Sequence, residues 1–173
     1  MTAMTHPIIN LDQIDLPPRP AAYGAPGDAA TRFDSRMGEV GARIGARKLG
    51  YNITAVPPGK RAFPLHNHRV NEEMFFILEG SGEVRIGDET FPLRAGDFLA
   101  CPPGGPELAH QIVNTGETEL KYLAVSTMLY PEICEYPDSG KFLIAEAPRS
   151  AATAHTFRHV GRPQSNLDYW EGE

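Results

Sequence analysis

Hydrophobic and polar residues alternate in short runs through the middle of the chain, and Gly, Pro, Asn and Asp residues separate these runs. A period of two is typical of β-strands with one buried face, whereas the separating residues favour turns. The first run, residues 48–56, stops at Pro57-Pro58-Gly59, which cannot continue a strand ladder. The later runs are PLHNH, MFFIL, EVRIG, TFPLR, DFLAC, HQIVN and ELKYLAVST. About eight short strands with regular turns predict an all-β sandwich or barrel without an internal helix.

The segments on either side of these strands lack the clear alternation. The N-terminal segment is rich in Pro and Gly and then shows only weak helical periodicity, so its local structure stays open. In the C-terminal segment KFLIAE and HTFRHV could each add a strand, and we expect Tyr169-Trp170 to dock on the body or on a partner subunit. We therefore predict an N-terminal arm (1–46), a barrel core (47–127) and a C-terminal extension (128–173) packed on the barrel.

The bulk properties exclude several classes of protein. A chain of 173 residues with 41% hydrophobic residues fits one soluble domain with some decoration. Its formal net charge of −6 argues against nucleic acid as a partner, because phosphate binding needs a basic surface. No apolar run approaches the length of a membrane span, and the N-terminus does not resemble a secretion signal, so we expect a cytoplasmic protein without membrane contact. Two cysteines form no disulfide framework, and we interpret Cys101 as a small buried hydrophobe.

Three side chains that can bind metal lie close together in the second and third runs. His66 and His68 are two residues apart, so on an extended strand both imidazoles point the same way. Glu73 then opens the MFFIL run, and pairing of these two strands would bring its carboxylate beside both histidines. Phe75 and Ile77 share the face of Glu73 and are expected to form barrel core. The set offers two nitrogens and one oxygen, with positions left open on a metal.

A fourth candidate ligand, His110, begins another alternating strand after a Pro- and Gly-rich turn. The two blocks together resemble the two signature motifs of the cupin superfamily. The first motif is formed by Gly59, His66, His68, Glu73 and Gly80, and the second by Gly96, Pro102, Gly104, His110 and Asn114. The spacer before His66 is one residue longer than usual, and the gap before His110 is three residues longer. Neither departure changes a ligand position, and the resemblance covers roughly residues 47–127.

The resemblance implies a double-stranded β-helix, or jelly-roll, cupin barrel with N- and C-terminal extensions. Single-domain bacterial cupins (cupin type 2) of unassigned function share the stretches PPGKRAFP, CPPGG and YPDSGK. In the family such an arm often adds a strand to the barrel edge or crosses to a second subunit, which favours a homodimer.

Metal binding explains His66, His68, Glu73 and His110 better than a barrel that has lost its metal. Three imidazoles and a carboxylate buried without a cation would each need another partner, whereas coordination satisfies all four at once. We therefore expect one divalent transition metal ion, and the spacing does not select among Fe, Mn, Ni, Co, Cu and Zn.

The sequence offers few further groups for catalysis. Glu107, in the lengthened loop before His110, could act as a lid residue or a second acid, and Tyr122 and Arg61 are the other candidates. We predict a mononuclear metalloenzyme of oxygenase, isomerase or lyase type that acts on a small organic molecule. The alternatives are a small-molecule binding or sensor protein without turnover, and a barrel in which the metal only stabilises the fold.

Overall fold

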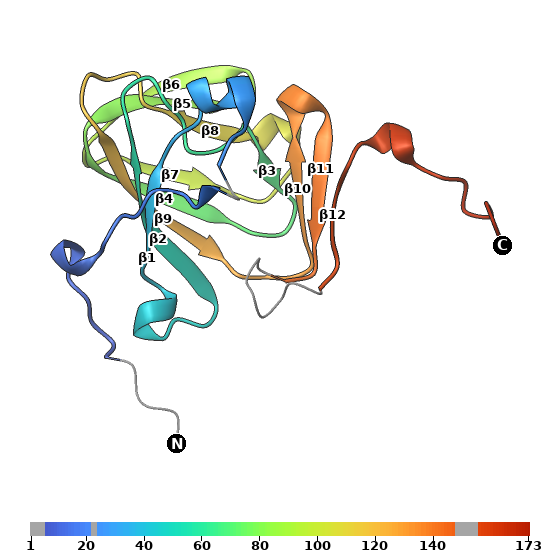
Figure 1. The fold of residues 1–173 in the computed structure, drawn as a ribbon, viewed down its shortest axis with the longest axis horizontal. Helices are drawn as coiled ribbons and strands as arrows, with labels where there is room; N and C mark the ends of the chain where they lie inside the picture. The colour runs from blue at the N-terminus through green and yellow to red at the C-terminus, as the bar shows by residue number, and fades with distance from the viewer. Residues whose placement is uncertain (1–5, 22–23, 148–155) are drawn as a thin grey trace.

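The computed structural model describes residues 6–21, 24–147 and 156–173. In this part of the chain the strands form three antiparallel sheets, shown in Figure 1. A five-stranded sheet has the order β1-β2-β9-β4-β7, a three-stranded sheet the order β6-β5-β8, and a four-stranded sheet the order β12-β11-β10-β3. The predicted all-β class is confirmed.

The strands are β1 (Arg36–Glu39), β2 (Leu49–Val56), β3 (Asn67–His68), β4 (Glu73–Glu79), β5 (Ser81–Ile86), β6 (Glu89–Arg94), β7 (Phe98–Cys101), β8 (His110–Val113), β9 (Leu120–Thr127), β10 (Glu132–Tyr136), β11 (Lys141–Ala145) and β12 (Arg158–Gly161). Short 3-10 helices connect or flank them: η1 (Leu11–Gln13), η3 (Gly27–Thr31), η4 (Ala42–Ile44), η5 (Pro106–Leu108), η6 (Pro137–Ser139) and η7 (Pro163–Ser165). None of the helices in the described residues is long and apolar enough to cross a membrane.

The core lies between the five-stranded and the three-stranded sheet, as in a jelly roll. Phe75 and Ile77 are buried on the inner face of β4, as the alternation predicts. Burial of each such side chain stabilises the fold by about 1.5–3 kcal/mol. The core cluster consists of Val56, Ala62, Phe75, Ile77, Val84, Leu93, Leu99, Cys101, Ile112, Leu120 and Tyr122.

The predicted pairing of the histidine strand with the MFFIL strand is wrong. His68 on β3 pairs with Cys134 on β10, whereas β4 pairs with β7 and β9. Residues 69–72 carry the chain from one sheet to another, so Glu73 meets the histidines across the barrel and not along a ladder. Alternation predicts which face of a strand is buried but does not predict its neighbour.

Both extensions join the sheets. In the arm, β1 adds an edge strand beside β2, with Glu39 opposite Asn52. In the extension, the two expected strands appear as β11 and β12, and β10, which the sequence did not predict, links them to β3. Tyr169 and Trp170 are 84% and 73% exposed, so they do not dock on the body of the same chain.

Candidate metal centre

The segment before β3 holds His66 against β8. The backbone N–H of His66 donates to the carbonyl of His110 at 3.2 Å, and the N–H of His110 donates back to the carbonyl of His66 at 2.8 Å. This reciprocal pair places both rings on one side, with centroids 4.7 Å apart. The His68 ring follows two residues later, with its centroid 5.1 Å from that of His66. The prediction that His66 and His68 point the same way is confirmed.

The three imidazoles converge on one oxygen of Glu73. Its Oε2 atom lies 3.0 Å from Nε2 of His110, 3.2 Å from Nε2 of His68 and 3.9 Å from Nε2 of His66. The four side chains come from three segments, the one around β3, β4 and β8, and meet inside the barrel. The structure therefore brings together the four side chains that the sequence singled out.

The outer nitrogens of two of these rings are fixed by other groups. Nδ1 of His66 lies 2.9 Å from the carbonyl oxygen of Pro64, to which it can donate. Nδ1 of His68 lies 3.3 Å from a carboxylate oxygen of Glu132 on β10. Donation from Nδ1 leaves the Nε2 lone pair free to bind a metal, and histidines that bind metals are commonly held in this way.

Glu132 is a functional candidate that the sequence analysis missed. It is buried, and its carboxylate accepts hydrogen bonds from the backbone N–H groups of Val70, Asn71 and Ile133 as well as from the Asn71 side chain. The sequence contains little that would identify Glu132 as a functional residue. Once β10 is known, alternation places Glu132, Cys134 and Tyr136 on one face, but no motif marks this strand in advance.

A second group of possible ligands, His68, Glu132 and Cys134, lies on the far side of the His68 ring. Cys134 Sγ is 3.3 Å from the same Nδ1 atom that faces Glu132. One imidazole cannot donate from Nδ1 and bind a metal there at the same time. The first group consists of His66, His68 and Glu73, and His110 lies beside it with Nε2 3.0 Å from Glu73. Because it offers more imidazoles than the second group, the first group is the better metal site.

The electrostatics of the site favour a positive charge beside its carboxylates. Although burial opposes the charged form, hydrogen bonds to Cys134 and Glu132 and the nearby Glu73 raise the pKa of His68 to about 12, so a metal would replace a proton on this ring. Burial, together with the neighbouring His110, lowers the pKa of His66 to about 4, so this ring is neutral and can act as a ligand at neutral pH. Burial alone would raise the pKa of Glu73, but the hydrogen bond from His110 and the close imidazole of His68 hold it well below its usual range. Nε2 of His68 and Nδ1 of His110 are buried without a hydrogen bond. A metal bound to His68 would give one of these atoms its missing partner.

Tyr122 is the candidate catalytic group that lies beside the metal ligands. It lines a small cavity of about 20 Å³ together with His66, His110 and Phe75. The rings of Phe75 and Tyr122 meet edge to face at 5.7 Å. Burial, and then the charge of Glu73, raise the pKa of Tyr122, so its phenol stays protonated.

The other two candidates lie elsewhere. The carboxylate of Glu107 accepts a hydrogen bond from the Gly105 N–H at 3.0 Å, and its side chain lines a separate cavity beside β5 and β6. Arg61 points to the outer side of the barrel, where its guanidinium lies near the Gln111 side chain. The extra residues before His110 form η5, which directs Glu107 away from the four ligands.

The cupin domain model matches residues 52–126. Protein SchB from Streptomyces halstedii is 30% identical over 107 residues, which cover 62% of this chain and 72% of that protein. This chain belongs to the cupin superfamily. The family predicted from the two histidine motifs is thereby confirmed.

Other curated relatives match a shorter region of this chain. An uncharacterised protein from Methanocaldococcus jannaschii is 39% identical over 71 residues, or 41% of this chain and 54% of its own length. An oxalate-binding protein from Thermotoga maritima is 36% identical over 74 residues, or 43% of this chain and 58% of its own length. The chain thus spans a little over half the length of these two relatives.

Solved structures share the cupin fold over more of the chain. A sugar phosphate isomerase from Silicibacter pomeroyi is 22% identical with a TM-score of 0.76, covering 94% of this chain and 98% of that one. A predicted oxalate decarboxylase from Thermotoga maritima is 26% identical with a TM-score of 0.56, covering 70% of this chain and 99% of that one. The first comparison shows that the jelly-roll fold extends beyond the region of the family model.

Proposed function

We propose that this cupin binds one divalent transition metal ion through His66, His68, Glu73 and His110 and acts there on a small organic molecule. The observation that carries the proposal is the convergence of three imidazole Nε2 atoms on one Glu73 oxygen, within 3.0–3.9 Å. When bound, such a metal polarises an oxygen atom of a substrate or activates a small molecule in its open positions. The ligand set suits Fe, Mn, Ni, Co, Cu or Zn.

The side chains around the metal ligands define what the chain itself contributes. Glu132 holds His68 so that its Nε2 faces the site, and Pro64 does the same for His66 through its carbonyl oxygen. Phe75, Ile112 and Tyr122 line the adjoining cavity and make its wall largely apolar. Tyr122 keeps its proton because its raised pKa makes it a weak acid, so it can donate a hydrogen bond to a substrate oxygen. A hydrogen bond to a developing negative charge on such an oxygen suits an isomerase or a lyase.

The alternative is a protein that binds a small ligand without turnover. The cavity of about 20 Å³ beside the ligands holds little more than one water molecule, so a substrate must be very small or must displace side chains. The relatives are consistent with binding alone and with an enzyme, because one is named an oxalate-binding protein and a solved neighbour is named a predicted oxalate decarboxylase. Oxalate is therefore the first ligand to test.

Cobalt-loaded protein titrated with oxalate tests this function. We expect the visible absorption of Co(II) to change on loading and again on adding oxalate, because oxalate oxygens enter the open metal positions. His66→Ala should abolish both changes. Release of formate and CO₂ by the loaded protein, lost in Tyr122→Phe with the cobalt spectrum retained, would support a lyase; unchanged oxalate would support the binding protein. No spectral change on loading the wild type with cobalt would refute the metal site.

A further inference from the structure

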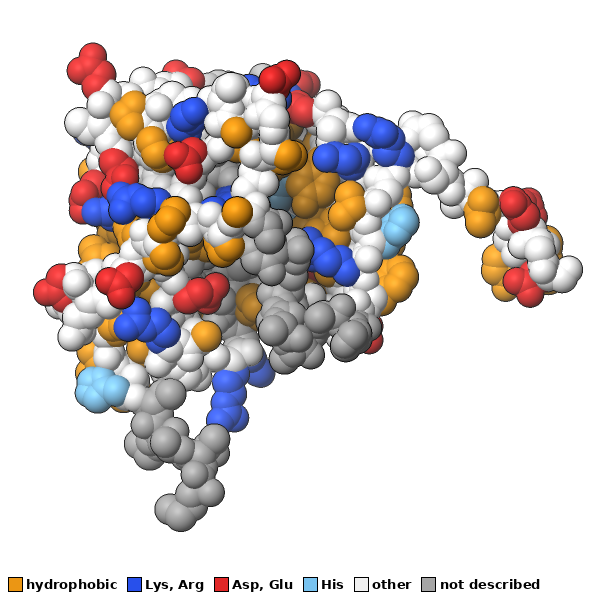
Figure 2. Space-filling view, in the orientation of Figure 1, with side chains coloured by type: hydrophobic (Ala, Val, Ile, Leu, Met, Phe, Trp, Pro, Cys, Tyr) orange, Lys and Arg blue, Asp and Glu red, His pale blue; other side chains and the backbone are white. Residues whose placement is uncertain are grey.

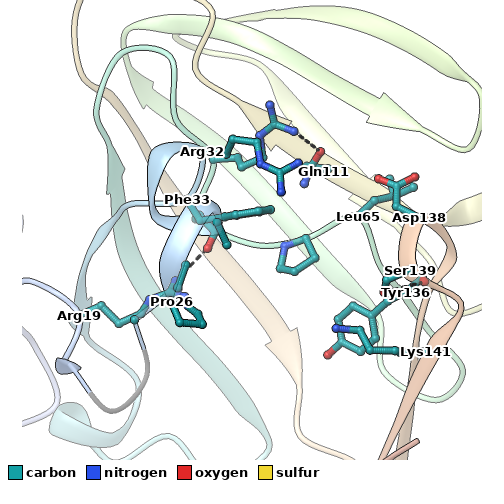
Figure 3. Close-up of a pocket in the computed structure, with 16 residues that line it drawn as sticks. Arg19, Pro26, Arg32, Phe33, Leu65, Gln111, Tyr136, Asp138, Ser139 and Lys141 are labelled. Carbon is teal, nitrogen blue, oxygen red and sulfur yellow. Dashed lines mark hydrogen bonds between the residues drawn. The ribbon is translucent and has the colours of Figure 1, made fainter. Parts of the chain in front are cut away.

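A larger cavity of about 480 Å³ lies on the outer side of the barrel. It is bounded by the arm around η3, by the segment before β3 together with β8, and by the β10–β11 hairpin, as Figure 3 shows. Its size is in the range of pockets that hold a metabolite. In Figure 2 the surface is hollowed between the arm and this hairpin, and Lys and Arg side chains lie at the rim.

This pocket concentrates positive charge in a protein whose net charge is −6. Four cationic side chains line it: Arg19, Arg32, Arg61 and Lys141. Across the described ranges, none of the four has a carboxylate oxygen within ion-pair distance. Asp138, the acidic residue of the lining, binds Arg85 at 2.9 Å outside the pocket. Uncompensated cations in one hollow favour an anion.

Arg32 and Arg61 both approach the aromatic ring of Phe33. Their guanidinium carbons are 5.8 Å and 5.7 Å from the centroid of Phe33. Phe33 follows η3, and the backbone N–H of Arg61 donates to the carbonyl of Arg32 at 3.1 Å, which fixes the two segments against each other. Two like charges that flank one ring favour an anion between them, because its attraction to both offsets their repulsion.

Donors of Arg61 are available for a ligand. Its Nε atom is buried without a hydrogen bond, and its Nη1 atom reaches Gln111 Oε1 only at 3.5 Å. A guanidinium presents five N–H donors in a fork that matches carboxylate and phosphate oxygens. A buried donor without a partner is costly, so an anionic oxygen here would satisfy a group that the protein leaves unpaired.

The opposite end of the pocket is also polar. Lys141 lies 5.8 Å from the ring centroid of Tyr136, and the Ser139 hydroxyl belongs to the same hairpin. Between the two ends Pro64 and Leu65 make the lining apolar. A ligand that fits this arrangement has a short carbon skeleton and anionic or hydroxyl groups at its ends.

We propose that this pocket is a binding site for a small organic anion, with a phosphate or carboxylate group held between Arg32 and Arg61. The site goes beyond the metal-dependent function and does not require the metal, because none of its four cationic side chains lines the cavity beside His66 and His110. The arm and the extension, which lie outside the matched cupin region, contribute Arg32 and Lys141.

The probe for this site is 2-phosphoglycolate, which carries a phosphate and a carboxylate on a two-carbon skeleton. Binding is measured by calorimetry on the full chain in excess chelator, so that the ligand cannot bind a metal. We expect saturable binding to the wild type and about tenfold or more weaker binding to the double variant Arg32→Gln/Arg61→Gln. Arg94→Gln, an exposed arginine on β6, is the matched control and should bind as the wild type does.

A folding defect in the double variant would also weaken binding. The single variant Lys141→Gln is therefore measured as well, and melting curves check that both variants are folded. It should weaken binding of phosphoglycolate more than binding of inorganic phosphate, which cannot reach both ends of the pocket. Absence of binding to the wild type at millimolar ligand, or equal binding to the double variant and Arg94→Gln, would overturn the anion site. Either result would leave the metal site unaffected, since metal content is measured separately.

Discussion

Glu132 shows at the level of one residue how the C-terminal extension serves the barrel. Its carboxylate faces Nδ1 of His68 while His68 presents Nε2 to Glu73. The sequence identifies His66, His68, Glu73 and His110 because their spacing is a motif. It does not identify Glu132, because a residue that acts through a histidine has no fixed distance from it along the chain.

Glu132→Gln should reduce metal affinity by about 10–100-fold, because an amide favours the required His68 tautomer less strongly than a carboxylate does. Affinity is measured by competition with a coloured zinc chelator. Glu135→Gln is the control, since Glu135 lies on the same strand but pairs with Arg69 at 2.7 Å. Equal zinc affinity of the two variants would contradict a positioning role for Glu132.

Cys101 provides a prediction about pH. Burial, and then the charge of Glu73, raise its pKa to about 12, and the residue is only 5% exposed. A group with a raised pKa stays protonated, so raising the pH from 7 to 9 should not make this thiol reactive, whereas an ordinary cysteine with a pKa near 8.5 would ionise. Alkylation at pH 9 followed by peptide mass spectrometry should find Cys101 modified only in denaturant. Rapid alkylation of Cys101 in the folded protein would contradict this assignment.

The turn between β4 and β5 shows what determines the fold at the level of elements. Gly80 has φ = 80°, and the chain changes from the five-stranded to the three-stranded sheet at this point. Alternation predicts both strands from residues such as Phe75, Ile77 and Val84. It does not predict that consecutive strands belong to different sheets, because long-range pairing depends on the packing of the whole barrel.

Gly80→Ala should destabilise the protein more than Gly96→Ala. Both glycines have positive φ, but a Cβ at Gly80 would collide with the Glu119 carbonyl, whereas a Cβ at Gly96 meets no atom within 4 Å. The conformational strain alone costs about 1–2 kcal/mol, and we expect about 3 kcal/mol or more at Gly80. Urea unfolding followed by circular dichroism gives both values. Equal free energies of unfolding would show that the Glu119 backbone adjusts freely.

The two extensions determine the outline of the whole molecule. The C-terminal segment runs away from the barrel in Figure 1, and it carries the exposed side chains Leu167, Tyr169 and Trp170. The sequence predicts that Tyr169-Trp170 docks on a surface, and the body of the same chain does not provide one. We propose that a second copy of the chain covers these side chains in a homodimer.

Trp170 is the single tryptophan of the sequence, so its fluorescence reports on this contact alone. We expect a dimer by light scattering and a red shift of the emission on dilution, as the indole becomes exposed to water. Trp170→Ser should shift the mass toward the 18.9 kDa monomer, with Phe157→Ser as the control for loss of an exposed aromatic residue before β12. A monomeric wild type with emission independent of concentration would refute the dimer.

The central claim is that His66, His68, Glu73 and His110 hold one metal ion, and elemental analysis tests it most directly. Untagged wild type and His66→Ala are purified without chelator and compared side by side. We predict close to one equivalent of Fe, Mn, Ni, Co, Cu or Zn in the wild type and its loss in the variant. A wild type that contains no metal and takes up none of these ions when they are added would contradict the claim.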